Sequence, residues 1–142
     1  RCINNKIIEM IETGPNSFMF SKELDSGLLR DLYEGDLEYA EVVFGDFLKY
    51  LPDYFGEVEQ AYNGKKIDEL RKAVHKCKTL MGFVGLSHIQ STYQAVEKKC
   101  ESAEHISELD ADYRDLQNQT ESGKKIITIE LDRLKAFNGT KK

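Results

Sequence analysis

One histidine lies among basic and small residues in a segment with helical periodicity. His75 is followed one turn later by Lys78 and preceded one turn earlier by Arg71 and Lys72, so the four share one strip of a helix. Imidazole has an ordinary pKa of about 6.5, so its free nitrogen is an available nucleophile at neutral pH. Neighbouring cations favour the neutral ring and stabilise an anion bound to it. The pattern therefore indicates an exposed histidine that meets an anionic partner.

The charge distribution supports this interpretation. Residues 65–78 contain six Lys or Arg and two Asp or Glu, whereas the chain as a whole has a formal net charge of −5. An acidic chain is a poor general binder of nucleic acid, and a local basic strip suits a single anionic protein surface. Gly82 lies on the same strip, and a glycine inside a helix costs roughly 1 kcal/mol relative to alanine. We interpret Gly82 as space for the close approach of another molecule.

The elements that must hold this strip are amphipathic helices, because apolar residues recur throughout the chain at three- and four-residue steps. The predicted segments are 3–11, 24–35, 36–64, 67–85, 87–100 and 107–134. Asp36 and Ser87 are the predicted N-caps, Pro52 predicts a kink, and Gly123 is a predicted weak point. Short connections make successive helices antiparallel, which predicts an all-α, up-down-up-down four-helix bundle preceded by an N-terminal helical arm. We divide the chain into an arm packed on the bundle (1–23), the bundle (24–138) and a tail (139–142).

Composition excludes several other classes. With 10 Gly and 2 Pro in 142 residues, the chain lacks the frequent turns of an all-β fold. No apolar run is long enough to span a membrane, and no secretory signal is visible, so we expect a cytoplasmic protein without direct membrane contact. Three cysteines without a CxxC pair predict reduced thiols and no metal site. We also expect a monomer.

Residues 73–86 resemble the signature of histidine-containing phosphotransfer (HPt) domains. They read AVHKCKTLMGFVGL, with a Lys three residues after the His and Gly seven and ten residues after it. The resemblance implies that His75 accepts a phosphoryl group, that Lys78 stabilises it, and that Gly82 opens the face to the partner. The order of helices is also similar to that of the family from about Leu24 to Phe137. Thr79 departs from the usual Gly, and its branched side chain narrows the access to His75 unless its hydroxyl bonds back to its own helix.

The function that the resemblance implies is that of a phosphorelay intermediate in two-component signal transduction. His75 would take a phosphoryl group from the aspartate of one response-regulator receiver domain and pass it to another. Receivers of hybrid sensor histidine kinases are among the candidates. The partner would contact Arg71, Lys72, Thr79 and Gly82. The chain would bind no cofactor and have no kinase or ATPase activity of its own. Mg²⁺ is expected in the partner receiver domain.

Two other functional classes are alternatives to the phosphorelay. A helical adaptor without phosphorylation, docking an acidic partner through the basic strip around His75, remains the alternative. Phosphate incorporation at His75 separates it from the relay. A metal–carboxylate bundle is disfavoured, because none of the three histidines has a Glu three residues before it.

Overall fold

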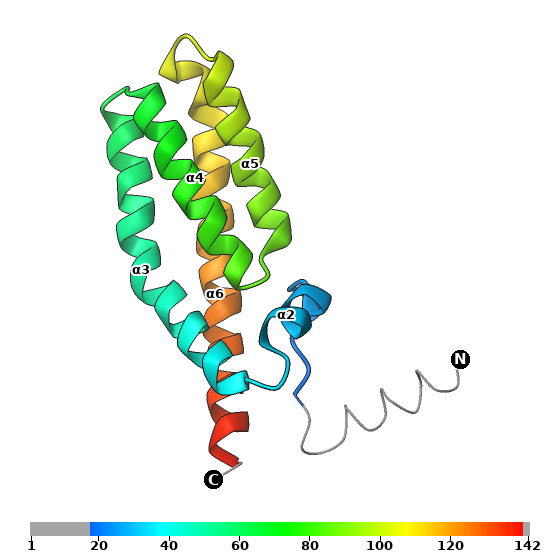
Figure 1. Cartoon of the computed structure of the whole chain (residues 1–142). Helices are drawn as coiled ribbons and strands as arrows, with labels where there is room; N and C mark the ends of the chain where they lie inside the picture. Colours follow the sequence, from blue (N-terminus) through cyan, green and yellow to red (C-terminus); the bar gives the residue numbers. More distant parts are fainter. Residues whose placement is uncertain (1–17, 141–142) are drawn as a thin grey trace, which may run out of the picture.

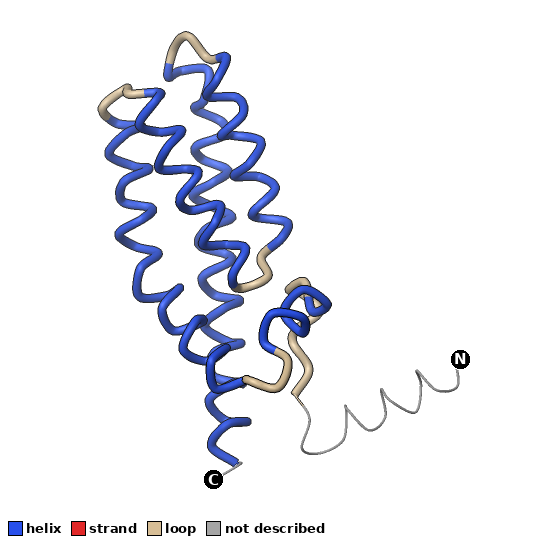
Figure 2. The backbone as a smooth tube through the Cα atoms, in the orientation of Figure 1, coloured by secondary structure: helices blue, strands red, loops and turns tan. Residues whose placement is uncertain are grey.

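The computed structural model describes residues 18–140, and within that range the chain contains helices but no strands (Figures 1 and 2). The predicted all-α class is confirmed. Four long helices run alternately up and down and form the expected bundle, and a shorter helix precedes them (Figure 1). The predicted segment 3–11 lies outside the described residues. The elements are α2 (Ser26–Tyr33), α3 (Leu37–Asn63), α4 (Ile67–Phe83), α5 (Ser87–Ser102), the 3-10 helix η1 (Ile106–Leu109) and α6 (Asp110–Thr140).

Helix α3 begins and ends where the sequence predicts. The Asp36 carboxylate accepts a hydrogen bond from the Tyr39 backbone N–H at 3.0 Å, which caps the first turn. The helix continues through Pro52 and changes direction in its N-terminal half (Figure 1), which agrees with a kink rather than a break. At its end, the Gly64 backbone N–H returns to the Gln60 carbonyl at 2.9 Å.

The bundle core is formed by the apolar faces predicted from the spacing. On α4 the buried residues include Val74, Cys77 and Met81, each fully inaccessible to solvent, and on α3 the aromatic rings of Phe44 and Phe47 are buried as well. Burying one large apolar side chain stabilises a fold by roughly 1.5–3 kcal/mol, so these faces hold α4 in a fixed rotation about its axis. The opposite face of α4, which carries His75, therefore points away from the core.

Two local predictions near α5 and α6 are wrong. Ser87 is the first residue of α5 rather than its N-cap, and its hydroxyl donates to Asp25 at 3.2 Å. The last helix begins at Asp110, because η1 occupies the preceding residues. Helix α6 is continuous through Gly123, where a Cβ would lie 2.9 Å from Cδ1 of Ile89 and 3.0 Å from Cδ1 of Leu86.

The chain before α2 is attached to the C-terminal half of α6. Phe18 packs edge-on against Phe137, with ring centroids 5.5 Å apart. The carboxylate of the buried Glu130 accepts a hydrogen bond from the Ser21 backbone N–H at 2.6 Å and pairs with Arg133. These contacts fix the start of α2. Helix α6 continues to Thr140, two residues beyond the predicted end of the bundle.

Helix α2 in turn covers the end of α4. The Tyr33 hydroxyl donates to the Phe83 carbonyl at 2.7 Å, and the Asp25 backbone N–H donates to the Gly85 carbonyl at 2.9 Å. The turn after α4 is therefore held by the chain that precedes the bundle. None of the helices between residues 18 and 140 is both long enough and apolar enough to cross a membrane.

Candidate functional site

His75 lies near the middle of α4, on the face opposite the core. Its side chain is 54% exposed, whereas Val74 and Cys77 beside it are fully buried. The sequence predicts this exposure, because a helix with one apolar stripe presents the remaining positions to solvent. The imidazole is therefore open to a partner molecule while its backbone is fixed by the core.

A carboxylate on the neighbouring helix fixes the orientation of the ring. Oε2 of Glu97, on α5, lies 2.7 Å from Nδ1 of His75. An ionised carboxylate only accepts hydrogen bonds, so in the neutral ring Nδ1 carries the hydrogen and the lone pair is on Nε2. Glu97 was not singled out from the sequence. Its contact with Nδ1 leaves Nε2 as the ring nitrogen with an available lone pair.

The same carboxylate also holds Lys78. Its Nζ lies 2.8 Å from Oε1 of Glu97, and the two side chains are only 21% and 16% exposed. Burial raises the pKa of Glu97, but hydrogen bonds from Lys78 and His75 oppose burial and leave this pKa below its ordinary value. Glu97 is therefore ionised at neutral pH, and the structure joins His75, Glu97 and Lys78 in one cluster.

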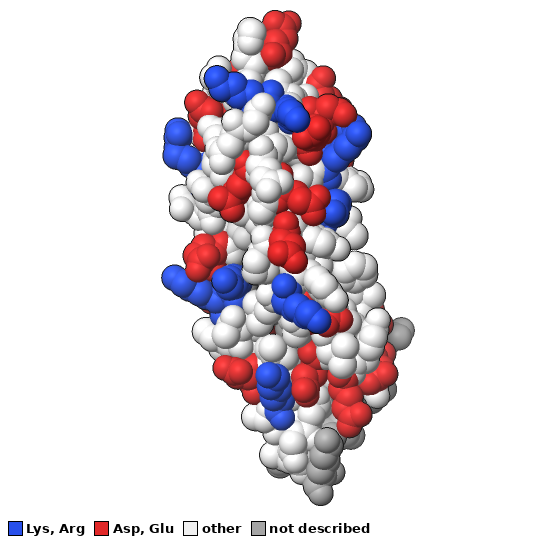
Figure 3. All heavy atoms as spheres, turned by 90° about the vertical axis from the view of Figure 1, so that its left-hand side faces the viewer, with Lys and Arg blue, Asp and Glu red and all other residues white. Residues whose placement is uncertain are grey.

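Most basic side chains of the predicted strip form ion pairs with acidic side chains, either on α4 itself or on α3. Arg71 donates to Asp68 at 3.0 Å, and Nζ of Lys72 lies 3.4 Å from the same carboxylate, so these hydrogen bonds lower the pKa of Asp68. Lys76 pairs with Glu57 of α3 at 2.9 Å, and Lys72 and Lys76 line a groove of about 430 Å³ between α3 and α4. Acidic and basic side chains are likewise interspersed over the face of the molecule shown in Figure 3.

A sequence profile of the Hpt domain matches residues 42–137, which is more than half of the chain. The chain belongs to the Hpt domain family. The family resemblance predicted from residues 73–86 is thereby confirmed. A role in phosphotransfer within two-component signalling follows from membership, and Hpt domains typically interact with receiver domains.

A solved structure supports the assignment of the fold. The HPT domain from the Hpt sensor hybrid histidine kinase from Shewanella matches this chain with a TM-score of 0.68. The two are 14% identical, and the match covers 78% of this chain and 95% of that one. At this identity the likeness concerns the fold. No curated protein sequence matches the chain significantly.

Gly82 of this Hpt domain lies against α5. A Cβ at Gly82 would lie 2.7 Å from Nε2 of Gln90, a residue of α5. The missing side chain therefore leaves room for the end of the Gln90 side chain. The contact of Gly82 with a partner stays a prediction.

Thr79 bonds back to its own helix, as anticipated for a tolerated threonine. Its hydroxyl donates to the His75 carbonyl at 3.3 Å. This hydrogen bond turns the hydroxyl toward the backbone rather than toward the imidazole ring. Thr79 therefore replaces the usual glycine without contributing a polar group to the ring nitrogens.

We expect Thr79→Ala to transfer phosphoryl groups at a rate within about twofold of the wild type, because the Thr79 hydroxyl is exposed and bonds only to its own helix backbone, and exposed substitutions usually change energies by about 0.5 kcal/mol or less. Thr79→Ser, which keeps the hydroxyl, is the matched control. Rapid-quench kinetics with a phosphorylated receiver measures both. A tenfold loss in Thr79→Ala that Thr79→Ser restores would show that the hydroxyl contacts the phosphoryl group.

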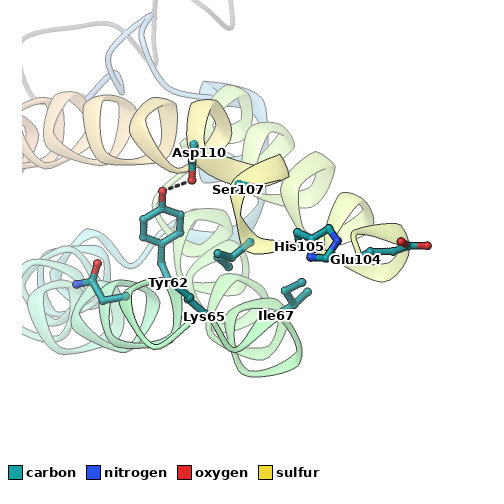
Figure 4. Close-up of a pocket in the computed structure, with 9 residues that line it drawn as sticks. Tyr62, Lys65, Ile67, Glu104, His105, Ser107 and Asp110 are labelled. Atoms are coloured by element: carbon teal, nitrogen blue, oxygen red, sulfur yellow. Dashed lines mark hydrogen bonds between the residues drawn. The ribbon is translucent and has the colours of Figure 1, made fainter.

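Other reactive groups lie apart from this site. Burial raises the pKa of the Cys77 thiol to about 12, so Cys77 is a core residue and not a partner of His75. A cavity of about 600 Å³ lies where α4 begins, and it is lined by Tyr62, whose hydroxyl donates to Asp110, and by His105 (Figure 4). Among residues 18–140, no group of three or more His, Cys, Asp or Glu is placed to hold a metal ion.

Proposed function

We propose that this Hpt domain is a phosphorelay intermediate in which His75 accepts a phosphoryl group from the aspartate of one receiver domain and passes it to another. The observation that carries the proposal is the exposed ring whose Nδ1 is tied to Glu97 at 2.7 Å. This arrangement presents the lone pair of Nε2 to solvent in a fixed direction. Positioning of this kind is the main contribution that a protein makes to phosphoryl transfer.

The transfer step needs only groups that His75 and the receiver supply. The Nε2 lone pair of His75 forms a bond to phosphorus while the bond from phosphorus to the receiver's aspartyl oxygen breaks, and the aspartate leaves as a carboxylate. The hydrogen on Nδ1 stays with the ring, next to Glu97. The receiver brings the activated phosphoryl group together with its own Mg²⁺, so this chain acts without a nucleotide and without kinase activity. Transfer to the second receiver is the same step in reverse.

The charges near His75 favour an acidic partner only weakly in the free protein. Arg71 and Lys72 share one carboxylate, Asp68, so the three side chains together contribute about one positive charge. Receiver phosphorylation sites are acidic, and this remaining charge attracts them at long range. The adaptor alternative relies on the same basic strip, so phosphate incorporation at His75 is the measurement that separates the two.

We expect Asp68→Asn to raise the second-order rate constant of transfer about twofold to fivefold at low ionic strength, because the substitution adds one net positive charge to the docking side. The gain should disappear near 1 M salt, where the screening length is about 3 Å. Asp132→Asn, on α6, makes the same charge change away from His75 and is the control. Equal rates for Asp68→Asn and Asp132→Asn at low salt would refute the steering role.

The proposed function is tested by incubating the chain with a panel of phosphorylated receivers and Mg²⁺. The expected product is one phosphoryl group per chain that is labile in acid and stable in alkali, as a phosphoramidate is. Intact-protein mass spectrometry and peptide mapping locate it on His75. If no receiver of the panel labels the chain, the relay is wrong and the adaptor alternative is favoured.

A further inference from the structure

Glu97 interacts at the same time with two groups of the proposed transfer reaction, through a hydrogen bond with His75 and an ion pair with Lys78. One carboxylate oxygen holds Nδ1 of His75 at 2.7 Å, and the other holds Nζ of Lys78 at 2.8 Å. Lys78 is therefore kept on the Nδ1 side of the ring, whereas a phosphoryl group on His75 would lie on the Nε2 side. The family resemblance gives Lys78 the role of stabilising that phosphoryl group. In this arrangement, however, the positive charge of Lys78 is already neutralised by Glu97.

The charge of Glu97 also affects the bond between nitrogen and phosphorus. When Nε2 carries phosphorus and Nδ1 keeps its hydrogen, the ring is a cation, and cleavage of the N–P bond releases a neutral imidazole. When Nδ1 has lost its hydrogen, the same cleavage must release an imidazolate, which is a far poorer leaving group. A carboxylate at hydrogen-bond distance from Nδ1 favours the protonated ring. Glu97 thereby favours the form that gives up its phosphoryl group.

Phosphorylation also sets two anions in competition for Lys78. Its Nζ must leave Oε1 of Glu97 in order to pair with the phosphoryl oxygens, so one ion pair is lost when the other forms. The Glu97–Lys78 pair is mostly shielded from solvent, and such pairs are screened less than exposed ones. The net stabilisation of the phosphoryl group by Lys78 is reduced accordingly.

We propose that Glu97 is a positioning residue that shortens the lifetime of the phosphohistidine, so that this domain hands its phosphoryl group on rapidly instead of storing it. The proposal rests on the proposed function of His75 and adds the regulation of that site. The protonation of the phosphorylated ring and the competition for Lys78 both depend on the negative charge of Glu97 and not on the shape of its side chain. The conservative variant Glu97→Gln therefore separates this role from simple packing.

In Glu97→Gln the amide can still accept from Nδ1–H, and it can also donate to an Nδ1 that has lost its hydrogen. We expect the half-life of the isolated phosphorylated domain at neutral pH to rise about tenfold. An opposite charge within about 4–6 Å usually changes a protonation equilibrium by about tenfold to a thousandfold. Removing the charge of Glu97 should change the protonation of the phosphorylated ring by about the smallest of these factors. The equilibrium with a receiver should shift toward phosphorylated His75.

A readout that packing alone would not move is the titration of the phosphorylated ring, followed by nuclear magnetic resonance. The charged groups around His75 are Glu97 of α5, Lys78, Lys72 and the Arg71–Asp68 pair of α4, and the Lys76–Glu57 pair that links α4 to α3. Of these groups among residues 18–140, Glu97 is the one that lies within hydrogen-bond distance of the ring, so Glu97→Gln should lower the pH at which the phosphorylated ring titrates. Unchanged titration together with an unchanged half-life would overturn the proposal.

A double-mutant cycle tests the competition for Lys78. Lys78→Ala in the Glu97→Gln background should lose part of the added lifetime, because the released lysine can no longer pair with the phosphoryl group. If the lifetime gained by Glu97→Gln is the same with and without Lys78, the competition for Lys78 is wrong. A wild-type chain that is never labelled on His75 would overturn the proposed function itself. A labelled wild type with a Glu97→Gln half-life equal to its own would overturn only the role of Glu97.

Discussion

Replacing His75 with glutamine is expected to reduce phosphoryl incorporation to background. Glutamine keeps a polar side chain of similar length, but its amide nitrogen has no available lone pair with which to attack phosphorus. The bundle and Glu97 contribute only positioning, which cannot act without a nucleophile. The measurement is the acid-labile label acquired from a phosphorylated receiver, compared with the wild type under the same conditions. Label that persists at the wild-type level in His75→Gln would refute the site assignment.

His88→Gln is the matched control, because His88 is also exposed but lies at the start of α5. It should incorporate label to the same extent as the wild type. Both substitutions replace exposed side chains, so each should change the free energy of unfolding by about 0.5 kcal/mol or less. Equal stability of the two variants, measured by urea denaturation, therefore attributes the loss of label to chemistry and not to unfolding.

The exposure of His75 could be predicted from the sequence because it depends on a single helix. The apolar stripe through Val74, Cys77 and Met81 defines the buried side of α4, and every other position follows from the helical angle. Glu97 is 22 residues away and belongs to another helix, so its position depends on the register between α4 and α5. That register follows from side-chain packing, of which the contact between Gly82 and Gln90 is one part.

The positive charge of the basic strip is smaller than the number of Lys and Arg residues along α4 indicates, because several of them have acidic partners. Asp68 precedes Arg71 and Lys72 by three and four residues, which is the spacing of intrahelical ion pairs, so this part of the signal was present in the sequence. Glu57, the partner of Lys76, belongs to α3 and could not be assigned before the helices were packed.

The start of α5 likewise depends on a tertiary partner that the local sequence does not reveal. Ser87 has the side chain of an N-cap, but its hydroxyl donates to Asp25, 62 residues earlier in the chain. A capping preference is a local tendency, and here a contact from the segment before α2 replaces it. The prediction failed where a tertiary partner competes with the local one.

Gly85→Ala is expected to be the most destabilising single substitution to alanine among the glycines at turns. Gly85 has a φ of +72°, a conformation that costs residues with a side chain roughly 1–2 kcal/mol. A Cβ there would also lie 2.8 Å from Cγ and Cδ1 of Leu29, a fully buried residue of α2. Overpacking of a core adds typically 1–3 kcal/mol. We expect a total loss of about 2–5 kcal/mol in the free energy of unfolding, measured by urea denaturation.

Gly35→Ala separates the two causes. Gly35 has a similar φ of +76°, but a Cβ there would meet no atom within 4 Å. The Gly35→Ala variant should lose about 1–2 kcal/mol in the free energy of unfolding, from the backbone conformation alone. The difference between the two variants therefore measures the cost of displacing Leu29, which holds α2 against the turn after α4. Equal losses would show that Leu29 moves aside freely and that α2 is not packed tightly on this turn. His75 and Glu97 lie outside this contact, so a folded Gly85→Ala domain should still incorporate its phosphoryl group.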